Sequence, residues 1–345
     1  MQLSTAEPGL LKESGGGTAA ENGLLPSRHA GSFDGRRRKL RLHGMAGYLF
    51  IMPAFSVLTL FFYIPAGLLF IMAFYHWNLF GNSTFAGWAN FSTLFNQPLY
   101  FRSLAETAYF AAVMVPADTL AGLALALLLR EGLGQLRSGK RRRGGGIGRS
   151  LVFLPHVTPV IATSIIWAWV FNPRYGLANY VLRTVGLGQP GWLDSTRWAM
   201  PAVMLYSLWH SVGYYAVFFL AGLAMVPDQV LEAAKADGAS RWYSFRRVVL
   251  PMISPTIFMV AILSSVASMQ AFSQIYALSG GPHGGAGGPA YATTTDALLI
   301  YNTAFIYQHI SLAAAMSLVL FLVLLAITLI QKRLARRWVY YGGDK

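Results

Sequence analysis

Long apolar runs separated by short polar segments dominate the sequence. Crossing about 30 Å of hydrocarbon takes roughly 20 helical residues, and six runs reach that length with few charges. Within a few residues at either end, they are Gly47 to Phe74, Thr107 to Leu129, Leu151 to Phe171, Ala199 to Val226, Thr256 to Leu278 and Ser311 to Ile330. This pattern predicts an all-α membrane protein with six transmembrane helices.

Lysine and arginine alternate from one side of these runs to the other. Residues 1–46, 130–149, 227–255 and 331–345 hold 7, 7, 4 and 5 of them, whereas all the other loops together hold only Arg102, Arg174, Arg183 and Arg197. Loops rich in positive charge stay in the cytoplasm. We therefore expect a multi-pass protein of a bacterial-type plasma (inner) membrane, with both termini cytoplasmic and residues 77–106, 172–198 and 279–310 outside.

Composition supports a lipid-embedded chain. Of the 345 residues 55% are hydrophobic and 12% charged, and the net charge is +14. A basic excess can indicate nucleic-acid binding, but here the charges lie between apolar runs, so we expect membrane lipid and no nucleic acid as a partner. The chain has no cysteine, which excludes disulfides and thiolate metal sites. We expect a disordered basic cytoplasmic tail over 1–44, a transmembrane domain over 45–335 and a cytoplasmic tail over 336–345.

The segment 227–255, between the fourth and fifth runs, reads as two short helices. Pro227 and Asp228 can start the first, and Gly238 can adopt the positive φ that ends it. The second is expected to run until Pro251 interrupts it. Three apolar residues at helical spacing share one of its faces: Trp242, Phe245 and Val249.

This segment resembles the EAA loop of bacterial ABC importer permeases. The pattern stands here as Glu232-Ala233-Ala234, Gly238, Val248 and Leu250-Pro251, with valine where the family has isoleucine. The resemblance implies that the loop inserts into a groove on a separate ATPase and transmits its ATP-driven closure to the spans. The implied coupling residues are Glu232, Ala233, Ala234, Asp237, Gly238, Trp242, Leu250 and Pro251. Small alanines would allow close approach, and Glu232 could form a charge-assisted bond to an arginine.

Further phrases resemble the carbohydrate-type branch, the maltose and glycerol-phosphate permeases. They include Phe153 to Pro159, Phe171 to Asn179, Phe219 to Leu223 and Ser279 to Pro282; the glycine-rich stretch His283 to Pro289 is interpreted as an insertion. The implied fold is a five-helix core made of spans two to six, about 105–332, preceded by one extra helix.

The resemblance also implies a function and partners. The chain would form half of a translocation pathway for a sugar, polyol or glycerol-phosphate solute. It would pair with a second permease subunit as a heterodimer, with two ATPase subunits that carry ATP and Mg²⁺, and with an external solute-binding protein. No catalytic residue, cofactor or metal is expected on this chain, which would not be an enzyme.

Three alternatives stay open. One is an ABC permease for a non-sugar solute, and another is an ion-coupled transporter, which predicts repeated halves with paired intramembrane charges. The third is an intramembrane enzyme or a scaffold, although no paired catalytic groups are evident.

Polar residues inside the runs are the candidates for the substrate pathway. Asp118 lies deep in span two, where a charge must face protein or water, and a structural hydrogen bond is the alternative. In span five, Gln270, Ser273 and Gln274 share a face at helical spacing, with Phe272 nearby, and could line a cavity or join helices. Trp209 and Tyr214 in span four are further candidates.

Two other signals are rejected on physical grounds. Gly134 to Arg141 nearly spells a phosphate loop, but Arg141 replaces the Mg²⁺-binding hydroxyl and no strand precedes it. We interpret the basic cluster Arg137 to Arg143 as a topology determinant instead. The seven histidines, His156 and His210 among them, show no metal-ligand spacing.

Overall fold

A computed structural model describes residues 48–77, 83–134, 152–280 and 287–338. The predicted tail 1–44, the cluster Arg137 to Arg143 and most of the glycine-rich stretch and of the C-terminal tail lie outside these ranges. The chain divides into two units, Met1–Tyr63 and Ile64–Lys345. In the first, residues 48–58 are α-helical and η1 (Thr59–Tyr63) is a π-helix. Its large apolar side chains are almost all exposed, as expected of a helix that faces lipid.

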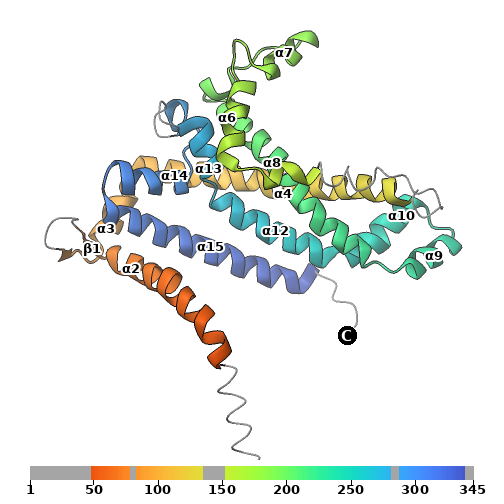
Figure 1. Cartoon of the computed structure of the whole chain (residues 1–345), viewed down its shortest axis with the longest axis horizontal. Coiled ribbons are helices and arrows are strands. Elements are labelled where there is room, and N and C mark those ends of the chain that lie inside the picture. Colours follow the sequence, from red (N-terminus) through yellow and green to blue (C-terminus); the bar gives the residue numbers. More distant parts are fainter. Residues whose placement is uncertain (1–47, 78–82, 135–151, 281–286, 339–345) are drawn as a thin grey trace, which may run out of the picture. The chain divides into compact units, whose positions relative to one another are not determined.

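The second unit is a bundle of long apolar helices. They are α4 (Pro98–Gly134), α8 (Ala199–Ala224), α12 (Ser254–Met269) and α15 (Ile310–Trp338). Figure 1 shows α12 between α4 and α15, and all three pairs of α4, α8 and α12 are in contact. Among the described residues, four helices have the length and composition to cross a membrane, or five if the bent pair Arg241–Met252 and Ser254–Met269 is one span. The helical membrane fold is therefore confirmed.

Shorter elements connect and flank these helices. The strands β1 (Tyr75–His76) and β2 (Thr84–Phe85) pair antiparallel, with Tyr75 opposite Phe85. The other elements are α2 (Ile64–Met72), α3 (Ala89–Phe95), α6 (Val160–Val170), α7 (Leu177–Thr184), η2 (Trp192–Asp194), α9 (Asp228–Ala236), α10 (Arg241–Ser244), η3 (Phe245–Val249), α11 (Leu250–Met252), α13 (Ser273–Ile275), η4 (Tyr276–Gly280), η5 (Pro289–Tyr291), α14 (Asp296–Tyr301) and η6 (Asn302–Ile306).

Two predicted runs are interrupted rather than continuous. The third is helical over 152–157, breaks at Thr158 and Pro159, and resumes as α6. The fifth ends as α12 at Met269 and resumes at α13. At this second break, the backbone carbonyl of Ala271 accepts a hydrogen bond from Thr295 Oγ1 at 2.9 Å, so a side chain replaces a helical bond. In α4, by contrast, the helix continues through Pro116.

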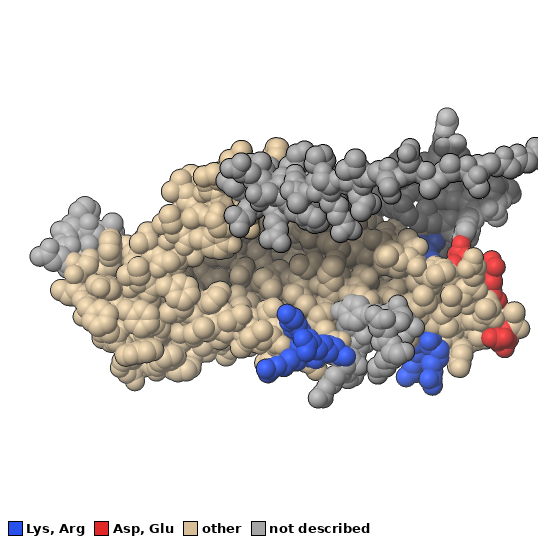
Figure 2. All heavy atoms as spheres, turned by 90° about the horizontal axis from the view of Figure 1, so that it is seen from below, with Lys and Arg blue, Asp and Glu red and all other residues tan. Residues whose placement is uncertain are grey.

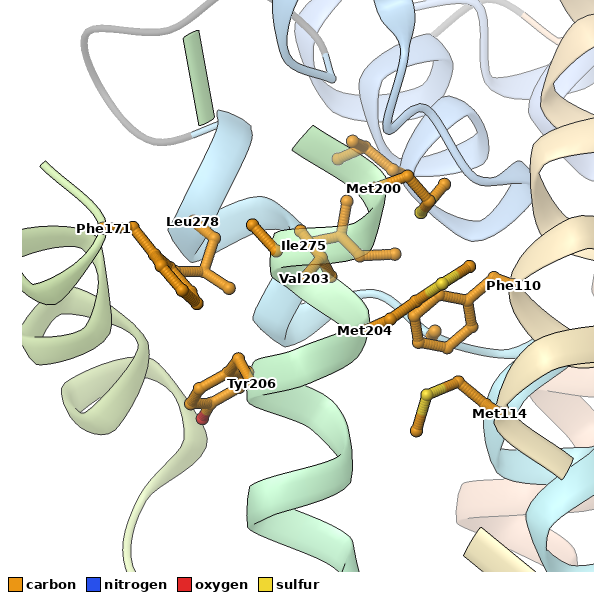
Figure 3. Close-up of a cluster of buried hydrophobic side chains, with 12 residues drawn as sticks. Phe110, Met114, Phe171, Met200, Val203, Met204, Tyr206, Ile275 and Leu278 are labelled. Atoms are coloured by element: carbon orange, nitrogen blue, oxygen red, sulfur yellow. The ribbon is translucent and has the colours of Figure 1, made fainter. Parts of the chain in front are cut away.

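Buried apolar side chains from several elements join the bundle. In Figure 3, Phe110 and Met114 of α4 face Met204 of α8, while Ile275 and Leu278 extend the cluster beyond the break. Close helix contacts occur at glycine, since a Cβ at Gly213 of α8 would collide with the backbone of Val152. This contact sets the 152–157 segment directly against α8.

Candidate functional site

The 227–255 segment forms the two helices that the sequence predicts. Helix α9 begins after Pro227, and Gly238 follows it with a φ of +78°. The side chain of Ser240 accepts a hydrogen bond from the Tyr243 backbone N–H at 3.2 Å and caps α10. A proline start, a left-handed glycine and a serine cap therefore build this turn from local sequence alone.

The second helix ends one residue after Pro251, close to where the sequence predicts its interruption. Helix α10 continues through the π-helix η3 into α11, which ends at Met252. The chain bends by 65° only after Met252. This bend directs the second helix away from the axis of α12.

The inner side of the loop is anchored in the bundle. Val249 and Ile253 are buried with Leu223 of α8 and Leu123 of α4, and Leu231 of α9 packs against the same cluster. These apolar contacts pack the base of the loop closely against α4 and α8.

The outer side of the loop is open. The exposed members of the predicted coupling set are Glu232, Ala233, Asp237, Gly238, Trp242 and Pro251, while Ala234 and Leu250 are half-buried. Trp242 is 68% exposed and touches the ring of Phe245 at 5.8 Å between centroids. Within the described chain, Glu232 has no hydrogen-bond or ion-pair partner. Figure 2 shows acidic side chains gathered at the end of the molecule where α9 lies. An exposed tryptophan and a free carboxylate on an anchored base form a surface suited to another protein.

A cavity of about 520 Å³ with several polar groups in its wall lies between α4, α8, α12 and the 152–157 segment. This volume falls within the roughly 300–1,000 Å³ of small-molecule sites. The lining includes Phe110, Met114, Asp118, His156, Val160, Tyr206, Ser207, His210, Ser211, Tyr214, Tyr215, Leu263, Val266, Ala267, Ser268, Gln270 and Gln274. Polar groups therefore converge in the middle of an apolar bundle.

Asp118 of α4 is the carboxylate of this cavity. It is 3% exposed, and its Oδ1 and Oδ2 accept hydrogen bonds from Ser211 Oγ and Ser264 Oγ, both at 2.6 Å. One residue from each of three helices thus meets at this point. Asp118 has both a structural contact and a place on the cavity wall.

Aromatic rings form another part of the wall. His156 stacks on Tyr214 with centroids 4.3 Å apart and planes at 21°, and His210 lies 5.3 Å from His156. Tyr206 places its hydroxyl 2.7 Å from Thr163 Oγ1 and donates to the Val160 carbonyl. In the part of the chain that the structure describes, no three metal-ligating side chains come together.

The predicted pathway residues divide into two groups. Asp118, Tyr214, Gln270 and Gln274 line the cavity, whereas Trp209, Phe272 and Ser273 do not. Trp209 packs on Trp167 at 5.2 Å, and Phe272 stacks on Tyr276 at 5.5 Å. The prediction that Gln270, Ser273 and Gln274 share one helix face is also wrong, because the helix stops before Gln270. The two glutamines reach the cavity from either side of this break.

Sequence reasoning missed several cavity residues. Ser207, His210 and Ser211 line the cavity beside the predicted Tyr214, and the four follow the spacing of three and four that marks one helix face. The spacing of these polar residues in an otherwise apolar span could have predicted a polar helix face.

Comparisons with known proteins agree with this geometry. The family described as binding-protein-dependent transport system inner membrane component matches residues 119–340. The sn-glycerol-3-phosphate transport system permease protein UgpA of Agrobacterium fabrum is 32% identical, over 86% of this chain and 96% of its own. The diacetylchitobiose uptake system permease protein NgcF of Streptomyces coelicolor is 35% identical, over 83% and 81%.

Solved structures show the same fold. A bacterial ABC transporter involved in the import of the acidic polysaccharide alginate superposes with a TM-score of 0.73 at 22% identity, over 88% of this chain and 99% of that one. The family match covers more than half of the chain, and the relatives align along most of their length. The chain therefore belongs to the family of binding-protein-dependent transport system inner membrane components.

Proposed function

We propose that this chain is one of two permease subunits of an ABC importer and forms half of the pathway for a sugar or a related polyol or glycerol-phosphate solute. The relatives' names support this solute range, since they include permeases for glycerol phosphate, diacetylchitobiose, and trehalose and maltose. The cavity supplies hydroxyl, amide and aromatic groups, which suit the hydroxyl groups that these solutes share.

The coupling surface is the observation that carries the proposal. Glu232, Ala233 and Gly238 present an exposed acidic and small-residue step on a base buried against α4 and α8. An ATPase that binds these exposed residues could displace both helices. ATP and Mg²⁺ would bind on two partner ATPase subunits, and this chain would carry no cofactor of its own.

The proposed topology has six spans with both termini cytoplasmic, in a bacterial-type inner membrane. Residues 152–157 with α6 would form the third span. The outer loops would receive an external solute-binding protein; a neighbouring alginate transporter has been solved in complex with a periplasmic protein that carries an alginate pentasaccharide. In our proposal, Asn179 fixes the shape of this outer surface, because its side chain accepts from Trp192 Nε1 at 2.8 Å and donates to two backbone carbonyls.

The test compares two single-charge removals in the complete transporter, purified with its partner permease, ATPase and solute-binding protein. Glu232→Ala changes the proposed coupling step, and Asp194→Ala removes an exposed carboxylate from η2, in the 172–198 loop that the proposed topology places outside. We expect Glu232→Ala to lose most of the retained ATPase and most of the ATP-driven uptake of a panel of trehalose, lactose, diacetylchitobiose and sn-glycerol-3-phosphate. Asp194→Ala should retain the ATPase.

Two results would reject the proposal. One is a Glu232→Ala complex that holds its ATPase and transports as the parent does. The other is uptake that continues without ATP and collapses when an ionophore dissipates the ion gradients, which would favour an ion-coupled transporter.

A further inference from the structure

The charge of the cavity distinguishes between the solutes named for the relatives. A phosphate ester carries a fixed negative charge, whereas a disaccharide is uncharged. A buried site that holds an anion needs positive side chains or backbone N–H groups to offset the lost hydration. The described lining of this cavity contains no lysine or arginine.

The lining instead contributes a negative group. Both oxygens of Asp118 act as hydrogen-bond acceptors, toward Ser211 and Ser264, which is the arrangement of an ionised carboxylate. His156 and His210 do not supply a fixed positive charge, because imidazole titrates near neutral pH. At mildly alkaline pH the wall is therefore anionic.

The remaining groups suit an uncharged polyhydroxylated molecule. The side chains of Gln270 and Gln274 have no hydrogen-bond partner within the described residues, so their donors and acceptors are free for hydroxyl groups. The stacked rings of His156 and Tyr214 form a flat surface against which the apolar face of a pyranose can lie. This combination discriminates by charge and not by shape alone.

Resting on the proposed function, we infer that the cavity admits uncharged carbohydrates and excludes phosphate esters, and that Asp118 is the residue that sets this discrimination. The carboxylate faces the cavity at a point where α4, α8 and α12 meet, so any solute that enters between them passes near it. Desolvation inside the bundle makes its repulsion of an anion stronger than it would be in water.

The absence of cysteine in the chain allows a direct test of this charge. Gln274→Cys places a single thiol on the cavity wall of the full-length protein in lipid nanodiscs at pH 8. Its rate of modification is measured with uncharged 2-hydroxyethyl methanethiosulfonate and with anionic 2-sulfonatoethyl methanethiosulfonate. Each rate is divided by the rate for free 2-mercaptoethanol. A change in thiol reactivity affects both reagents alike and cancels in their ratio.

We expect the anionic reagent to be slower than the uncharged one by on the order of tenfold in the cavity. Asp118→Asn, which keeps the size and can still bond the two serines, should remove most of this difference. A matched thiol from Ser92→Cys, on the exposed side of α3, should react with both reagents alike whether residue 118 is Asp or Asn.

Three results would overturn the inference: equal rates in the cavity, a difference that persists in Asp118→Asn, or a cavity thiol that neither reagent reaches. The outcome of this experiment is independent of the outcome of the Glu232→Ala test. An anion-tolerant cavity in a transporter that needs Glu232 rejects only the charge discrimination, whereas an anion-excluding cavity in a protein that never retains an ATPase rejects the proposed function.

Discussion

Replacing Gly213 by alanine tests whether the close packing of α8 against the 152–157 segment holds the cavity together. An added Cβ would overlap the carbonyl oxygen of Val152 and lie 2.9 Å from its carbonyl carbon and 3.3 Å from the Cα of Phe153. All three are backbone atoms, so a change of rotamer cannot relieve the overlap. The 152–157 segment must move away, and it carries His156.

The magnitude follows from two opposing effects. Alanine gains about 1 kcal/mol over glycine from helix propensity. Overpacking that forces a backbone shift costs about 1–3 kcal/mol, and this contact lies at the severe end of that range. We expect Gly213→Ala to lower the free energy of unfolding by about 1–2 kcal/mol and the melting temperature by a few degrees.

The assay is thermal unfolding of the purified protein in detergent, followed by tryptophan fluorescence. Gly67→Ala is the matched control, because its Cβ meets nothing within 4 Å and it should gain stability from propensity. If the two variants melt alike, the close contact between α8 and 152–157 is not part of the folded protein. Restored stability in Gly213→Ser would contradict the reasoning equally, because serine has the same Cβ.

Three further substitutions test other features. Because Gly238 has a positive φ, Gly238→Ala should destabilise the loop by about 1 kcal/mol and weaken retention of the ATPase, and Gly238→Asn should have an intermediate effect. Equal ATPase retention in the parent and both variants would contradict this. Asn179→Ala should lower the melting temperature and expose Trp192, read as a red shift in its fluorescence. Burial raises the pKa of Asp296 to about 7. The contribution of protonated Asp296 to the stability of the folded protein is therefore fully present below about pH 4 and is lost as pH rises through 7. Asp296→Asn should flatten melting temperature between pH 5 and 8, and an unchanged slope would refute it.

The two helices of the coupling loop could be predicted from the sequence because local interactions determine them. Pro227 and Gly238 each act over a few residues and bound α9 as the sequence predicts, and the cap at Ser240 is equally local. The widening of the second helix into the π-helix η3, by contrast, was not predicted. Val249 and Ile253 lie four residues apart, so one helix face carries both into the same buried cluster.

The sequence by itself determined the apolar runs, the alternation of positive charge between their loops, and the acidic-alanine-alanine step with its glycine. These are properties of single segments, set by hydrophobicity, helical period and backbone preference. Only the tertiary structure decided that Asp118 bonds serines of two other helices, that the fifth run breaks where Thr295 satisfies the Ala271 carbonyl, and that both glutamines reach one cavity. Periodicity tells which face of a helix is polar, but the partner of that face is chosen by packing between segments more than a hundred residues apart.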